Sequence, residues 1–171
     1  MFSGKSEELL RRLKRARIAK KKYQLFKPSV DNRYSETEVV SHSGERLNCQ
    51  VLHKNKSYQV NDALEDDTEI VAFDEAQFFD FGIWEVATSL ANMGRRVIIA
   101  GLDMDSRGKP FGFMPAIMSS AEEVLKLTAV CEVCGEQATH TYRFTDEDTK
   151  QVLVGADDHY QARCRDHWCA R

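Results

Sequence analysis

The sequence lacks any long apolar run. No stretch approaches the ~20 apolar residues that span a bilayer, and the opening MFSGKSEELLRRLKR has no apolar signal-peptide region. There is also no internal repeat and no low-complexity tract. These absences argue against a membrane-spanning, exported or fibrous protein, so we expect a cytoplasmic chain with no membrane partner.

Cysteine is present in an odd number, five. Such a set, without an export signal, is better explained by free thiols or metal ligands than by a disulfide framework. The 171 residues, 42% of them hydrophobic and 30% charged, suit a compact domain. A chain of this length can bury about 70% of its unfolded surface, so its core needs no disulfides.

The charge is distributed unevenly along the chain. Residues 1–27 contain ten Lys or Arg against two Glu, a net +8, whereas the remaining residues carry −11. The segment RRLKRARIAKKK is predicted to be the solvated face of a helix. The alternatives are a contact with phosphate groups, with another subunit or with nucleic acid.

Helical and extended patterns alternate in the first three quarters of the sequence. Helices are predicted over residues 6–20, 80–94 and about 115–126, and short strands over residues 23–26, 70–73 and 97–102. Two of the strands are continuous apolar runs, which is typical of burial on both faces of a parallel sheet. The order indicates an α/β fold, followed after Leu127 by short β-like pieces that form a smaller unit.

A phosphate-binding pattern stands at the start of the first helix. Gly4-Lys5-Ser6 is the second half of G-x-x-x-x-G-K-[ST], whose leading glycine would stand two residues before Met1. Backbone N–H groups at a helix N-terminus bind phosphate oxygens, Lys5 can bridge the β- and γ-phosphates, and the Ser6 hydroxyl can ligate Mg²⁺. A bare GKS also occurs by chance.

A pair of acids, Asp74 and Glu75, ends the apolar run 70–73. In phosphoryl-transfer sites the first acid of such a pair can hold Mg²⁺ while the second faces the substrate. The alternative is that both acids cap the next helix. Together with the GKS helix, the acid pair predicts a site for a nucleoside triphosphate.

Two knuckles near the carboxyl end, Cys131-x-x-Cys134 and Cys164-x-x-His167, are separated by β-like sequence. Thiolates and an imidazole suit zinc, and four protein ligands indicate a structural ion. Cys169 is an alternative fourth ligand, and an unmetallated set of thiols is the alternative to the whole site. Cys49 is expected to be an inert thiol.

In these motifs and their order, the sequence resembles the small, tetrameric, zinc-containing thymidine kinases of bacteria, some phages and animal cytosol. The likeness extends over essentially the whole chain, in the blocks MFSGKS, FKPSVDNRY, VSHSG, DEAQFFD, GLDMDSRGKPFG, LTAVCEVCG and VGADDHYQARCR. It implies a P-loop parallel sheet with helices on both faces over residues 1–127. A zinc-binding β subdomain with a substrate-covering loop would follow over residues 128–171.

The resemblance also implies an activity and the residues that carry it. The γ-phosphate of ATP would pass to the 5′-hydroxyl of thymidine, and usually of deoxyuridine, with Glu75 as the base. ATP and Mg²⁺ would bind Ser3, Gly4, Lys5, Ser6, Asp31, Arg33, Asp74 and Gln77. The nucleoside would meet Met1, Phe78, Leu102, Phe111 and Tyr160, and backbone groups of the loop with Gln151, Leu153 and Gly155 would read the base edge. The resemblance further implies a homotetramer, feedback inhibition by thymidine triphosphate and no nucleic-acid partner.

The sequence departs from the family pattern at three places. The first strand and the leading glycine are absent, so we expect roughly ten or more residues ending in Gly-x before Met1. We expect a chain that begins at Met1 to be poorly soluble or inactive. Ser106 stands where the family usually has an aromatic residue, which leaves one wall of the base pocket thinner or filled otherwise. The segment between Arg143 and Val152 is shorter than in many bacterial members of the family.

Three other functions remain open from the sequence. One is another deoxynucleoside kinase or a nucleotidase on the same scaffold, which thymidine phosphorylation would distinguish. The second is a nucleic-acid-binding zinc module with a basic helix, in which the acid pair after the strand would have no role. The third is a truncated, inactive product.

Overall fold

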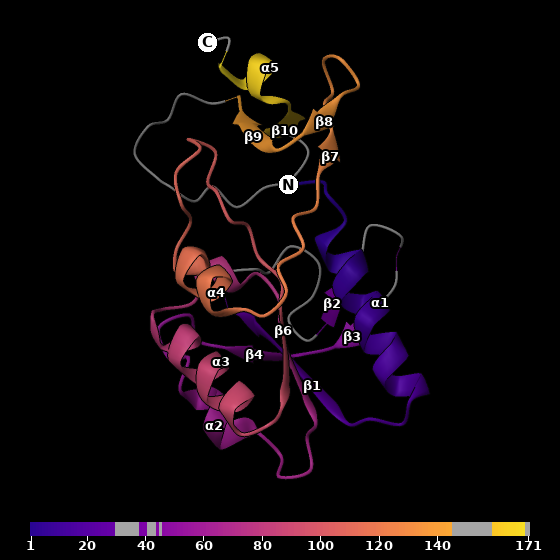
Figure 1. The fold of residues 1–171 in the computed structure, drawn as a ribbon, viewed down its shortest axis with the longest axis vertical. Helices are drawn as coiled ribbons and strands as arrows, with labels where there is room; N and C mark the ends of the chain where they lie inside the picture. Colours follow the sequence, from indigo (N-terminus) through magenta and orange to yellow (C-terminus); the bar gives the residue numbers. More distant parts are fainter. Residues whose placement is uncertain (30–37, 41–43, 45, 145–158, 170–171) are drawn as a thin grey trace.

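A four-stranded parallel sheet forms the centre of the protein, as a computed structural model describes it for residues 1–29, 38–40, 44, 46–144 and 159–169. The strand order is β4-β1-β5-β6, and each neighbouring pair is parallel (Figure 1). The bounds are β1 Tyr23–Pro28, β4 Gln50–Leu52, β5 Ile70–Phe73 and β6 Arg96–Ile99. This arrangement confirms the predicted α/β class.

Helices cover both faces of the sheet. Alternate residues of each strand point to opposite faces, and those of β5 are apolar on both faces, so each face needs a covering layer. Ile70 and Ala72 of β5 pack in one buried cluster with α1 (Lys5–Ile18) and with the hairpin of β2 (Glu38–Val40) and β3 (Arg46–Asn48). Val71 and Phe73 pack in a second cluster on the other face. The helices of that face are α2 (Gln59–Ala63), α3 (Gly82–Asn92) and α4 (Met114–Ser120) (Figure 1).

Two sequence-based boundaries were wrong. The helix expected to reach residue 126 ends at Ser120, where Ser119 and Ser120 donate their hydroxyls to carbonyls of the preceding turn and the next residue is extended. The strand expected to reach residue 102 ends at Ile99. The hairpin of β2 and β3 was not predicted, since it lies in a polar stretch without clear periodicity.

The carboxyl-terminal part consists of short antiparallel pairs. β7 (Ala129–Val130) pairs with β8 (Gln137–Ala138), and β9 (His140–Arg143) pairs with β10 (Tyr160–Arg163), before α5 (Arg165–Cys169). These elements have a small core of their own, against which Phe2 packs. Of the β-like sequence expected after Leu127, residues 145–158 lie outside the described part of the chain. A domain boundary between residues 127 and 128 stays a proposal.

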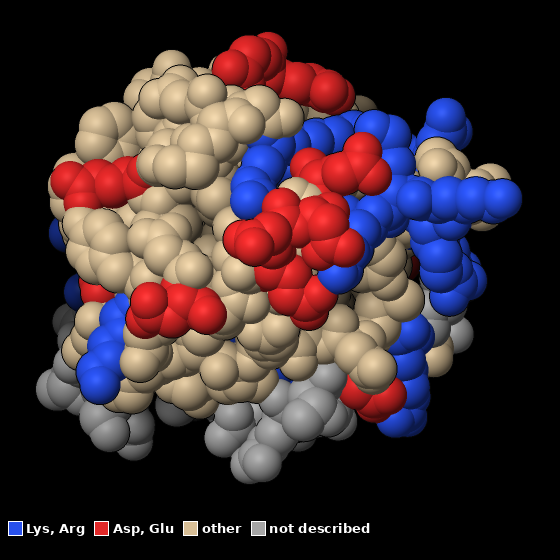
Figure 2. All heavy atoms as spheres, turned by 90° about the horizontal axis from the view of Figure 1, so that it is seen from below, with Lys and Arg blue, Asp and Glu red and all other residues tan. Residues whose placement is uncertain are grey.

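Part of the basic charge of the amino-terminal segment is paired within the chain. Hydrogen bonds from Arg11 and then Arg12 lower the pKa of Glu8 to about 2. Two lysines beyond the end of α1 are also paired. Lys21 Nζ lies 3.1 Å from Glu69 Oε2, and Lys22 Nζ lies 2.6 Å from Asp67 Oδ1. In Figure 2, Lys and Arg gather toward one side of the lower face with acidic side chains among them. These pairs fit the prediction of a solvated helix face.

No helix within the described ranges is both long and apolar enough to cross a membrane.

The packing of α1 on the sheet generates the first prediction. Leu10 is fully buried, whereas Ile18 at the end of the same helix is 81% exposed. Leu10→Ala should lower the free energy of unfolding by about 2–5 kcal/mol. Ile18→Ala should change it by less than about 0.5 kcal/mol. Urea denaturation of both variants checks this, and equal losses would contradict the packing of α1 on the sheet.

Candidate functional site

The candidate site lies where the carboxyl ends of the parallel strands meet the N-terminus of α1. Phe26, Phe73 and Ile99 are aligned in register at these ends. The segment after β5 returns to α1, where Lys5 Nζ lies 3.3 Å from Glu75 Oε1. Two motifs that are 70 residues apart in the sequence therefore meet, as their separate phosphoryl-transfer interpretations require.

The start of α1 has the backbone geometry of an anion-binding turn. Gly4, the N-cap residue, adopts the left-handed conformation at φ 76° and has no side chain with which to cap the helix. A Cβ at Gly4 would meet only Glu7 Oε2, at 3.8 Å, so backbone conformation and not space favours glycine here. The backbone N–H groups of the first turn, the helix dipole and the ammonium of Lys5 together suit a phosphate group.

The acid pair is buried and held in a fixed turn. Asp74 and Glu75 are 4% and 7% exposed, and Asp74 Oδ1 accepts the Glu75 N–H at 3.0 Å. Glu75 has φ 50°, a left-handed conformation that non-glycine residues seldom adopt and that is frequent at functional sites. It precedes the short helix η1 (Ala76–Phe78), yet its side chain makes no capping hydrogen bond. For Glu75, the capping alternative is not supported.

Gln77 fixes the Glu75 carboxylate from the side opposite Lys5. Its Nε2 donates to Glu75 Oε2, and its Oε1 accepts the Leu102 N–H at 2.9 Å. The surroundings leave it little room, because a Cβ at Gly101 would lie 3.0 Å from Gln77 Oε1 and one at Gly112 would lie 2.4 Å from Gln77 O. The sequence analysis placed Gln77 at the ATP site and did not predict its hydrogen bond to Glu75. The glycines of the GLD and PFG blocks, Gly101 and Gly112, were a signal that the backbone approaches another segment closely here.

Several predicted nucleoside residues lie near this turn. Phe78 and Phe111 meet edge to face with ring centroids 5.5 Å apart, and Leu102 contacts Gln77 through its N–H. Tyr160 lies in β10, opposite Arg143 in the register of that hairpin. The predicted residues Asp31, Arg33, Gln151, Leu153 and Gly155 lie outside the described residues.

A groove of about 330 Å³ runs along β6. The consecutive residues 97–104 line it, together with residues of α1, α3 and α4, the segments 120–127 and 138–141, and Met1 and Ser3. In the described part of the chain β6 is an outer strand, and this groove borders its open edge.

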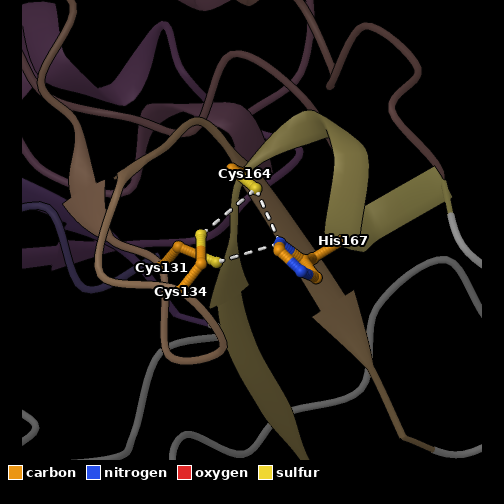
Figure 3. A group of neighbouring side chains, drawn as sticks. All are labelled: Cys131, Cys134, Cys164 and His167. Atoms are coloured by element: carbon orange, nitrogen blue, oxygen red, sulfur yellow. Dashed lines mark hydrogen bonds between the residues drawn. The ribbon is translucent and has the colours of Figure 1, made fainter.

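The four knuckle residues converge on one point, as Figure 3 shows. Their ligand atoms all lie within 4.8 Å of one another. Cys134 Sγ is 3.8 Å from Cys164 Sγ, and His167 Nδ1 is 4.0 Å from Cys131 Sγ and 3.1 Å from Cys164 Sγ. Tetrahedral zinc, with Zn–S near 2.3 Å and Zn–N near 2.0–2.1 Å, requires separations of about 3.5–3.8 Å. The cluster could hold one metal ion, and its donor set suits structural zinc.

The surroundings of Cys131 favour the thiolate that a metal ion requires. Burial raises the pKa of this thiol, but hydrogen bonds from the backbone N–H groups of Cys164, Val133 and Cys134 outweigh it and leave the pKa at about 6. Cys169, the alternative ligand, is exposed at the end of α5 and does not belong to the cluster.

One comparison with known proteins bears on this arrangement. The sequence matches the family described as thymidine kinase over residues 1–168, which is nearly its full length. Both the site at the strand ends and the Cys₃His cluster lie within the matched part. The chain therefore belongs to the thymidine kinase family.

Proposed function

We propose that the full-length protein transfers the γ-phosphate of ATP to the 5′-hydroxyl of thymidine, and also of deoxyuridine. Family membership implies the kinase reaction with ATP and thymidine, and the contact between Lys5 and Glu75 supports its location. This contact places the Glu75 carboxylate within 3.3 Å of the Lys5 ammonium, which belongs to the first turn of the helix whose N-terminus suits phosphate.

The triphosphate binds at the N-terminus of α1 in this proposal. Ser3, Gly4, Lys5 and Ser6 surround the phosphates, and Lys5 compensates charge on the β- and γ-groups. Mg²⁺ bound with ATP supplies charge neutralisation at these oxygens, and Asp74 and Ser6 are the described residues that would hold it. Asp31 and Arg33 are proposed to organise the metal and the transferring phosphate.

Glu75 is the proposed general base. As the 5′-oxygen bonds to the γ-phosphorus and the bond to the bridging oxygen of ADP breaks, the hydroxyl proton passes to the Glu75 carboxylate. Lys5 and Gln77 each hold one oxygen of this carboxylate, so its orientation is set before substrate binds. Phe78, Leu102 and Phe111, which lie beside Gln77 and η1, are proposed to line the base pocket with Met1 and Tyr160.

The proposed base gives a direct prediction. Glu75→Gln keeps the shape of the side chain and removes its basicity, so kcat should fall by about 10²–10⁴ while nucleoside binding changes little. Steady-state kinetics together with equilibrium binding of thymidine to the full-length protein check this. A variant with nearly normal kcat would exclude Glu75 as the base.

Zinc is the proposed occupant of the Cys₃His cluster. Purified protein should contain about one zinc per chain, and Cys131→Ser should lose the ion and lower the melting temperature, since structural zinc contributes folding free energy. Cys169→Ser is the matched control on the same unit and should retain the ion. Metal analysis that finds no zinc in fresh, unchelated protein would contradict this assignment.

The base specificity is proposed to depend on backbone groups of the loop that contains Gln151, Leu153 and Gly155. Cytosine presents a donor where thymine presents an acceptor, so its binding would leave buried groups unpaired at about 1–3 kcal/mol each. Deoxycytidine and purine nucleosides should be phosphorylated poorly, whereas deoxyuridine loses only the methyl contact. With Ser106 in place of an aromatic residue, a bulkier 5-substituent should also be accepted.

Comparison of kcat/KM for thymidine, deoxyuridine and deoxycytidine measures this specificity. A deoxycytidine value within tenfold of thymidine would favour a broader deoxynucleoside kinase.

The remaining parts of the proposal concern assembly and regulation. By the family resemblance, we propose a homotetramer that acts in the cytoplasm and is inhibited by thymidine triphosphate.

A further inference from the structure

Trp168 connects the metal cluster to a turn of the kinase site. It follows the candidate ligand His167 in α5, and its Nε1 donates to Ser106 O at 3.1 Å. Its ring covers Gly108, where an added Cβ would lie 2.8 Å from Trp168 Cη2. The other neighbour of the ring is His140 of β9, stacked with centroids 4.7 Å apart. The indole is therefore held between the carboxyl-terminal strands and the segment 106–108.

The turn that Trp168 contacts is closed by its own hydrogen bonds. Asp105 is 6% exposed, and its Oδ1 accepts the N–H groups of Arg107 at 2.9 Å and Lys109 at 3.0 Å. A backbone bridge joins Met104 to Pro110 at the base of the turn. Because these bonds hold residues 104–110 together, a contact at the tip constrains the base of the turn.

The base of this turn continues into the candidate site. Phe111 follows it and meets Phe78, and Gly112 approaches the Gln77 carbonyl as closely as glycine allows. Gln77 in turn holds Glu75. A continuous series of contacts thus extends from α5, through Trp168 and residues 104–112, to the proposed base pocket.

We propose that Trp168 is a positioning residue, through which the metal-bound cluster fixes the turn 104–110 and thereby the Phe111 side of the nucleoside pocket. This inference rests on the proposed function, since it concerns the thymidine site and zinc at the cluster. An isolated helix of five residues, such as α5, is not stable in water. The ion would hold α5 through Cys164 and His167, and Trp168 would transmit that order to the turn.

The indole also explains how the departure at position 106 is accommodated. Ser106 has a small side chain, and Trp168 binds the backbone carbonyl of this residue and covers Gly108. An aromatic ring from the carboxyl-terminal unit thus packs on this turn, where the family resemblance implies an aromatic residue at position 106. Support for the turn comes here from a different part of the chain.

The composition of the chain provides a spectroscopic test. It has two tryptophans, and Trp84→Phe leaves Trp168 as the sole indole emitter. Chelation of zinc from this variant should shift Trp168 emission to longer wavelength. The affinity for thymidine, measured by equilibrium dialysis, should fall at the chelator concentrations that produce this shift. Emission that does not respond to zinc removal would overturn the inference, whatever the kinase activity.

Kinetic variants of the full-length protein test the effect on substrate. Trp168→Ala should raise the KM for thymidine about tenfold, with the KM for ATP and the zinc content within twofold of wild type. Trp168→Phe keeps a ring on Gly108 and His140 but loses the N–H donor, so its effect should be smaller. An unchanged thymidine KM, or equal rises for thymidine and ATP, would overturn the positioning role.

Two glycines provide a matched pair that approaches the same contact from the other side. Gly108 and Gly94 both have positive φ, 70° and 80°, but only Gly108 faces an indole, and Gly94 has no atom within 4 Å of an added Cβ. Gly108→Ala should reproduce the rise in thymidine KM, whereas Gly94→Ala should lower thermal stability alone. Equal kinetic effects of the two would contradict the inference, and wild-type protein that never phosphorylates thymidine would contradict the proposed function instead.

Discussion

The turn at the carboxyl end of β5 is the constraint on which the candidate site depends. Strand β5 is buried on both faces and cannot shift without exposing Val71 and Phe73, so the position of Glu75 is fixed by the core. Lys5 of α1 and Gln77 of η1 then hold the two carboxylate oxygens of Glu75, whose backbone is left-handed. Such a conformation costs of order 1–3 kcal/mol and persists only where the surrounding structure enforces it. That cost is understandable if the site requires a carboxylate in one orientation.

The other parts of the molecule are arranged around this turn. On one face of the sheet, α1 brings its N-terminus, which begins at Gly4, to the strand ends. On the other face, Gly101 and Gly112 allow the segments after β6 and before α4 to close on Gln77. The carboxyl-terminal unit reaches the site through Trp168 and through Thr141, whose Oγ1 accepts a hydrogen bond from the Met1 nitrogen at 3.0 Å. The Cys₃His cluster and the candidate site are therefore connected by packing, as the proposed role of Trp168 requires.

The sequence predicted the features that depend on local pattern. Continuous apolar runs identified β5 and β6, and the GKS helix, the acid pair and the paired knuckles identified groups that the structure brings together. What it did not predict depends on contacts between distant residues. Nothing in the local sequence shows that Gln77 binds Leu102 N–H, that Trp168 covers Gly108, or that Val39 and Leu47 bring a polar stretch into the core beneath α1. The early end of α4 was missed because the hydroxyls of Ser119 and Ser120 compete for helix carbonyls, an effect that apolar periodicity does not reveal.

A crystal structure of the protein with thymidine, Mg²⁺ and a non-hydrolysable ATP analogue tests whether Glu75 is the base. We expect the thymidine 5′-oxygen to lie about 2.6–3.2 Å from a Glu75 carboxylate oxygen. We also expect the terminal phosphate of the analogue to lie at the N-terminus of α1, in contact with Lys5. A 5′-oxygen bound by a different side chain, or phosphates placed away from α1, would contradict the proposed site.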